Sequence, residues 1–457
     1  MAVGLRLRFQ DARPGDGPWL FYGERPPVGE GRNRCLALAC SGSAWSFLDG
    51  RDDVRRPGLI EGLPVALGEA PVASGEGWDI GFDLFANAFY FLSSWSERRG
   101  QGQTSGRQMF RDSAFARLGM PQDIVDRYLS FWWEKLKIAT GDAFSERGLT
   151  WPDNRDYAVV LSHDVDFIPA GLGDTLKQGG KTLLRHLLRE RKPGDALRAA
   201  FGLAAALASG RDAYGCLPEI IQQECRLGVR SSFQVAVARR HPNDVNYDVD
   251  DPRTRDYLGI VTRSGFDLCL HGSYLSTDEA ATYQQEAEKL RSSFGAVAGS
   301  RQHFLSFDYD RLFAAQEASG IQYDMSLGYP DCAGPRAGFS YPFFPYNLDA
   351  DRPFNVVQIP LFLMDVTLRV YMGLRGEAAR EAVWAELDAL RSKGGGVSVV
   401  WHPIVFGEAR DPGMSQLYWD MVQYVLETRG LATDGRAVNS FWREKAVGYR
   451  SFVRCRA

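Results

Sequence analysis

From residue 157 onward, short apolar runs of strand length alternate with longer amphipathic stretches. The apolar runs cover residues 157–161, 232–237, 266–270, 356–361 and 397–401, and the clearest helical patterns cover 278–294 and 377–390. Alternating strands and helices indicate parallel strands joined by crossover helices. Runs that are apolar at every position suit strands buried on both faces. The pattern therefore predicts an α/β fold, either a barrel or a doubly wound sheet, with chemistry where the strands end.

The first 150 residues follow a different pattern. Short apolar runs at 36–39 and 63–67 lie among Gly and Pro and predict short strands with turns. Apolar residues at helical spacing over 84–95 predict a helix, and a second helix begins near Pro121. We expect a smaller mixed α+β accessory domain of unknown function over residues 1–150, followed by a catalytic unit over 151–457.

A basic stretch interrupts the alternation. Residues 174–212 contain eight Lys or Arg against four acidic residues. Lys177, Lys181, Arg185 and Arg189 step by four and so share one helix face, while leucines occupy another. This predicts a basic helical insertion at about 170–215. It is either a solvated helix packed on its own domain or, through 174–192, a peripheral contact with an anionic membrane that brings the protein to a lipid-linked glycan.

Bulk composition narrows the class of protein. The 457 residues are 45% hydrophobic and carry a net charge of −4, which suits a globular protein and does not favour nucleic-acid binding. The seven cysteines are scattered without a CxxC motif, as expected for reduced thiols. The N-terminus lacks the apolar stretch of a signal peptide, and no apolar run approaches the roughly 20 residues that span a bilayer. We expect a cytoplasmic protein, with peripheral membrane association as the alternative.

Candidate chemistry begins with Asp164 and Asp166, which follow the apolar residues 158–161. Side chains two apart on a strand face the same way, so both carboxylates point to one side and His163 to the other. Two carboxylates are costly to bury unless they hold a metal ion or share protons. One can bind a divalent ion while the other accepts a proton from water. The alternative is a pair of aspartates that cap a loop.

Three of the six histidines lie at or just beyond the predicted strand ends. His271 follows the run 266–270, His402 follows the run 397–401, and His303 lies in a polar segment after Arg301. A single histidine in such a place is more often structural. Several together beside an aspartate pair predict a metal site with a general acid, because imidazole is both a common metal ligand and a good proton donor.

The order of these pieces resembles a known family. An Asp-x-Asp pair, then His271 with a serine two positions on, then Arg-x-x-Phe at 301–304, then a strand ending in His402, is similar to the NodB-homology polysaccharide deacetylases, carbohydrate esterase family four. The resemblance covers roughly residues 155–405. Residues 82–97 resemble the uncharacterised domain that precedes such deacetylases in many bacterial exopolysaccharide loci, and the segment 328–331 fits the same subgroup.

The resemblance implies a distorted (β/α) barrel and a role for each matching residue. Asp164 matches the catalytic base, and Arg301 matches the residue that holds it. Asp166 and His271 match metal ligands, and His402 matches the general acid that protonates the leaving amine. The implied cofactor is a divalent metal, zinc first, with cobalt, nickel or manganese as alternatives.

Asp365 is a further candidate from its position after the run 356–361. It would lie on the same rim and orient His402 through a hydrogen bond to the imidazole. The alternative is an aspartate at an ordinary turn from strand to loop. Phe304, Tyr329 and Asp331 are the predicted substrate-binding residues.

The sequence departs from the family at one ligand. The family's second motif has two histidines four apart, but His271 is followed four residues later by Leu275, which cannot bind a metal. His303 is the first choice for the third ligand, His163 is an alternative if the strand twists, and Asp331 is the last choice. Otherwise the metal is loosely held or the site is inactive.

These features predict a hydrolase that removes an acyl group, N-acetyl first, from an amino sugar in a polysaccharide or lipid-linked glycan. One alternative is an inactive relative that binds glycan or a partner in exopolysaccharide biosynthesis. Another is an amidohydrolase that acts on a small non-sugar amide.

Overall fold

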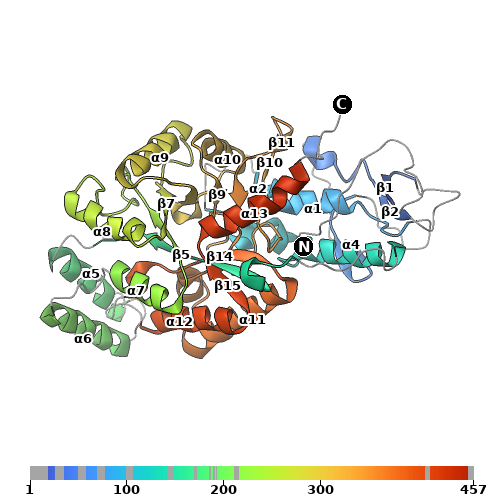
Figure 1. Ribbon diagram of the computed structural model, residues 1–457. Helices are drawn as coiled ribbons and strands as arrows, with labels where there is room; N and C mark the ends of the chain where they lie inside the picture. Colours follow the sequence, from blue (N-terminus) through green and yellow to red (C-terminus); the bar gives the residue numbers. More distant parts are fainter. Residues whose placement is uncertain are drawn as a thin grey trace.

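Figure 1 shows the computed structural model of the protein. The described residues are 19–25, 35–49, 58–68, 78–98, 107–140, 149–168, 172–184, 187–188, 191, 193–209, 216–406 and 412–450.

One large parallel sheet forms the centre of the molecule. Its strands are β5 (Tyr157–Val165), β6 (Ser232–Val235), β7 (Asp267–Gly272), β8 (Gly299–Gln302), β9 (Tyr323–Asp324), β12 (Val357–Gln358), β13 (Leu361–Met364), β14 (Gly396–Val400) and β15 (Gly430–Thr433). The order is β12-β9-β8-β7-β6-β5-β14-β13, with β15 also pairing β5, and every pair is parallel. Parallel pairing throughout is what the alternating pattern predicted.

The sheet closes on itself through the segment 357–364. β12 pairs with β9 at one end of the strand order, and β13, which begins three residues after β12 ends, pairs with β14 at the other end. The predicted distorted (β/α) barrel is therefore confirmed. The single strand expected over 356–361 was wrong. It is broken at Pro360, which has no backbone N–H to donate, while its carbonyl accepts from the backbone N–H of Ser398.

Helices surround the barrel. They are α7 (Leu217–Leu227), α8 (Pro252–Arg263), α9 (Ala280–Phe294), α10 (Tyr309–Ala318), α11 (Gly376–Lys393), α12 (Pro412–Glu427) and α13 (Gly435–Arg450). α11 shows how they pack: Ala379, Val383, Leu387 and Leu390 recur at helical spacing, and all are fully buried against strand residues such as Val397. A small antiparallel ribbon, β10 (Tyr346–Asn347) with β11 (Arg352–Pro353), extends from the loops beyond β9.

The N-terminal region combines short strands with helices, as predicted. β1 (Trp19–Gly23) pairs in parallel with β2 (Cys35–Ala39), and β3 (Gly58–Ile60) forms a hairpin with β4 (Leu63–Val65). The helices are α1 (Leu84–Leu92), α2 (Trp95–Arg98), α3 (Ala114–Leu118) and α4 (Ile124–Thr140). α1 begins where the Asp83 side chain accepts a hydrogen bond from the Ala86 backbone N–H. The domain boundary at residue 150 stays a prediction.

The basic stretch forms a helical hairpin rather than one helix. α5 (Leu172–Leu184) and α6 (Pro193–Ser209) pack against each other at the opposite end of the molecule from β1 and β2 (Figure 1). Two of the residues predicted to form the basic face, Arg185 and Arg189, lie outside the described residues. Within the part of the chain that is described, no helix is both long and apolar enough to span a bilayer.

Candidate metal centre

The site is built at the carboxyl end of β5. Asp164 is buried at the end of this strand, and its Oδ1 accepts a hydrogen bond from Nη1 of Arg301 at 2.7 Å. Arg301 comes from β8, is itself fully buried, and also donates to the Met325 carbonyl and the Ser162 hydroxyl. Burial raises the pKa of Asp164, but the positive charges of Arg301, His271 and His402 together outweigh burial, and the pKa falls below its usual value. Asp164 is therefore held as a carboxylate.

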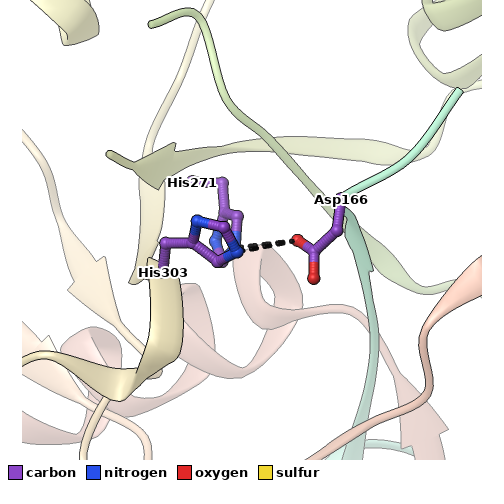
Figure 2. Close-up of side chains that lie close together, drawn as sticks. All are labelled: Asp166, His271 and His303. Atoms are coloured by element: carbon purple, nitrogen blue, oxygen red, sulfur yellow. Dashed lines mark ion pairs between the residues drawn. The ribbon is translucent and has the colours of Figure 1, made fainter. Parts of the chain in front are cut away.

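Asp166, His271 and His303 converge beside it (Figure 2). Oδ1 of Asp166 lies 3.2 Å from Nε2 of His271 and 3.6 Å from Nε2 of His303. One side-chain atom from each of the three residues lies within 4.8 Å of the other two. Asp166 follows β5, His271 lies near the end of β7, and His303 follows β8. β6 lies between β5 and β7, and β7 pairs directly with β8, so all three residues lie at one end of the barrel.

The hydrogen bonds of this group suit a cation. Nδ1 of His271 is 3.0 Å from the Arg301 carbonyl oxygen, which can only accept, so Nδ1 carries the proton. In the neutral ring, Nε2 then presents a lone pair toward the Asp166 carboxylate. Both Nε2 of His271 and Oδ1 of Asp166 are buried without a hydrogen-bond partner among the described residues. A divalent ion would satisfy these atoms, and an Asp and two His are a ligand set that zinc accepts.

The three choices for the third ligand lie in different places. His303 lies with Asp166 and His271, which agrees with the sequence-based first choice. His163 points to the opposite face of β5, where Nε2 is 3.1 Å from Glu224 and Nδ1 is 2.7 Å from the Trp401 carbonyl oxygen. Asp331 accepts a hydrogen bond from the backbone N–H of Phe110 in the N-terminal region.

His402 faces the same site from the end of β14. Its Nε2 lies 3.5 Å from Oδ2 of Asp166, and its Nδ1 lies 2.7 Å from Oδ1 of the fully buried Asp365. Burial alone would lower the pKa of His402, but the charge and hydrogen bond of Asp365, together with the charges of Asp166 and Asp164, outweigh burial and raise the pKa to about 9. The pair predicted from the sequence is thus in contact, and it keeps a protonated imidazole beside the carboxylates.

Aromatic side chains surround this centre, and only one of them was predicted. Phe304 is 37% exposed, follows His303 directly, and adopts a left-handed backbone conformation with φ of 60°. Such a backbone is unusual for a bulky residue and is found most often at functional sites. The ring of Tyr274, also 37% exposed, meets Phe304 edge-on at 5.8 Å and stacks on His241 at 4.2 Å.

Two further rim residues were missed because they come from distant segments. Cζ of Arg107, in the N-terminal region, lies 5.8 Å from the centre of the Phe304 ring and 5.0 Å from that of Tyr371. Arg107 also donates a hydrogen bond to the Tyr371 hydroxyl. Tyr371 is 37% exposed and ends the short π-helix at Thr367–Tyr371, just after Asp365. No local sequence pattern links these positions.

The other two predicted substrate-binding residues, Tyr329 and Asp331, contact the N-terminal region. Tyr329 is buried, and its hydroxyl donates to Glu97 of α2 at 3.2 Å. Tyr329 and Asp331 therefore join the barrel to the N-terminal region, and a role for either in binding substrate stays a prediction.

The chain was compared with known proteins in three ways. No family model matches it, and the search of curated proteins found no match. Among solved structures, a protein from Mycobacterium smegmatis assigned as a polysaccharide deacetylase has 18% identity and a TM-score of 0.44, covering 66% of this chain and 95% of its own. Puue allantoinase has 14% identity and a TM-score of 0.43, covering 66% and 96%. Both are too distant to transfer a substrate or a reaction.

Proposed function

We propose that this protein is a metal-dependent hydrolase that removes an acyl group, N-acetyl first, from an amino sugar of a polysaccharide or lipid-linked glycan. The observation that carries the proposal is the grouping of Asp166, His271 and His303 beside a separate base and a separate acid. A protein that only binds glycan does not need a proton-accepting base and a proton-donating acid at one centre.

Each site residue has its own role in the proposed reaction. Asp166, His271 and His303 would hold the metal, with zinc the ion that this ligand set suits best. A divalent ion in that position would polarise the amide carbonyl and make a water molecule more acidic. Asp164, kept ionised by Arg301, takes a proton from the attacking water.

His402 supplies the second proton transfer. Its Nε2 faces the site while its Nδ1 is bonded to Asp365, so the proton on Nε2 is available for the leaving amine nitrogen. The exposed rings of Phe304 and Tyr274 offer flat apolar surfaces on which a sugar ring can stack. These two exposed rings favour a glycan as the substrate over a small amide.

The test combines metal content with acetate release. Purified protein, reconstituted separately with zinc, cobalt, nickel and manganese, is assayed for bound metal and for acetate released from N-acetylglucosamine oligomers. We expect one bound ion per chain and measurable release. His303→Ala should lose both, whereas Asp164→Asn should keep the metal and lose activity by about 10²- to 10⁴-fold, the range for removal of a general base.

His241→Ala is the matched control for metal content, because it removes a histidine that lies outside the group of three. Failure of the wild type to bind any of the four metals would refute the proposal. Metal binding without acetate release would favour the inactive glycan-binding alternative instead.

A further inference from the structure

The α5–α6 hairpin carries an unusual number of exposed apolar side chains. They are Leu176, Leu184, Leu187, Leu188, Leu197 and Phe201, and Leu188 and Phe201 are 73% and 68% exposed. Six of the thirteen exposed large apolar side chains among the described residues fall in this one hairpin, and such a concentration marks a site of contact with another molecule or a membrane. We name these six residues the hairpin apolar patch.

The patch is not needed for packing the two helices together. A Cβ on Gly179 of α5 would meet the Leu203 side chain of α6, so the helices approach closely there. Thr182, Ala196 and Ala199 are buried in the same hairpin. Small side chains and Leu203 therefore form the inner face, and the larger apolar residues point outward.

Positive charge accompanies the patch. Lys177 and Lys181 of α5, and Arg191 between the helices, are exposed. The stretch 174–212 as a whole has four more basic than acidic residues, although the chain has a net charge of −4. Exposed leucines and phenylalanine combined with lysine and arginine are the composition of a helix that lies in the interface of an anionic membrane.

We propose that the α5–α6 hairpin binds the protein peripherally to a bilayer that contains anionic phospholipid. The apolar side chains enter the boundary between headgroups and acyl chains, and the basic side chains contact the lipid phosphates. A second copy of the chain fits this surface less well, because a symmetric contact would place the two positive stretches against each other.

The position of the hairpin suits such a contact. It lies at the end of the molecule opposite β1 and β2, so a membrane there leaves the N-terminal region free (Figure 1). α5 begins at Leu172, only six residues after Asp166. Six residues span at most about 20 Å, so the start of the hairpin is close to the candidate metal centre.

The test is co-sedimentation of the full chain with vesicles of phosphatidylcholine alone or mixed with phosphatidylglycerol. We expect binding to the mixed vesicles, weakened by salt, and little binding to phosphatidylcholine. The triple variant Leu187→Ser, Leu188→Ser, Phe201→Ser should weaken binding by at least about tenfold, and Lys177→Ser and Lys181→Ser by about fivefold each. Because these side chains are exposed, circular dichroism should show unchanged folding.

The double variant Leu59→Ser, Ile138→Ser is the matched control, since it removes exposed apolar residues of the N-terminal region and should bind as wild type does. Absence of binding to the mixed vesicles, or equal binding by the triple variant, would overturn the proposal. If light scattering instead shows a dimer that the triple variant abolishes, a second copy covers the patch. Vesicle binding needs no substrate turnover, so its result is independent of the proposed reaction.

Discussion

Asp365 contacts both the imidazole and the backbone N–H of His402, and among the neighbouring charges it does most to raise the pKa of that imidazole. The two side chains are 2.7 Å apart, and Asp365 is fully buried, so its charge acts on the imidazole with little screening by water. An acid must carry its proton, and a pKa of about 9 keeps His402 protonated up to about that pH. A base must be ionised, and the lowered pKa of Asp164 keeps it so down to below the usual carboxylate range.

We therefore predict that Asp365→Asn shifts the alkaline limb of the pH–rate profile. The wild-type rate should fall as pH rises through about 9. Without the Asp365 charge, the fall should move toward about 6.5, the ordinary value for histidine, while the acidic limb set by Asp164 stays in place. The measurement is kcat/KM for acetate release across pH. Asp388→Asn, which changes an exposed carboxylate on α11, should leave both limbs unchanged, and an unshifted limb in Asp365→Asn would contradict the role of the pair.

The site residues that were easiest to predict from the sequence are those that follow an apolar, strand-like run. Asp164, Asp166, His271 and His402 each follow a recognisable apolar run, so parallel strands bring them to one end of the barrel. Arg107 and Tyr371 have no such marker, and Tyr274, although it closely follows β7, is placed against Phe304 by the conformation of the loop. The sequence alone therefore predicts the candidate ligands and proton carriers better than the surface that would recognise substrate.

At the level of elements, β8 shows where hydrophobic patterns fail. Gly299–Gln302 reads Gly-Ser-Arg-Gln, yet every residue is buried. Most of the polar side chains find buried partners: Arg301 donates to Asp164, Gln302 donates to Ser276 and Thr277, and Ser300 accepts from Tyr283 of α9. A strand stabilised by buried polar contacts has no apolar run in its sequence. The sequence therefore predicted Arg301 as a site residue but did not predict the strand that carries it.

The pairing of β7 with β8 makes Gly272 a sensitive position. Gly272 lies opposite Gln302, next to the two candidate histidines, and a Cβ on it would come within 2.6 Å of the Gln302 Cδ. We predict that Gly272→Ala lowers the free energy of unfolding by about 1–3 kcal/mol through overpacking, and weakens metal binding. Chemical denaturation and metal titration measure the two effects.

The control for Gly272→Ala is Gly180→Ala in α5, where a Cβ meets open space. This change should stabilise the protein by up to about 1 kcal/mol, because alanine favours a helix. Equal stability of Gly272→Ala and the wild type would show that the Gln302 side chain moves aside easily enough to admit a methyl group.

At the scale of the whole molecule, the N-terminal region is joined to the barrel by buried polar contacts. Arg336, almost fully buried, donates to Glu97 of α2, and Tyr329 donates to the same carboxylate. Asp126 of α4 accepts from the backbone and hydroxyl of Ser340. Removing one partner of the Arg336–Glu97 pair would leave a buried charge unpaired and cost about 3–5 kcal/mol, so this junction is sensitive to substitution. The sequence led us to expect an accessory role for the N-terminal region. It could not predict that a residue of this region would contact the rim of the candidate site.

Arg107 is a residue of that region that reaches the rim of the candidate site. Its guanidinium lies beside the rings of Phe304 and Tyr371 and bonds the Tyr371 hydroxyl, so it holds together two rim elements that approach from different strands. We predict that Arg107→Ala lowers kcat/KM for acetate release by about tenfold or more, since a hydrogen bond to a charged group contributes about 1.5–3 kcal/mol. Metal content should not change, because Arg107 is not among the three candidate ligands. Arg111→Ala, which removes an exposed arginine of the same region, should match the wild type, and a normal rate in Arg107→Ala would mean that the N-terminal region only supports the barrel.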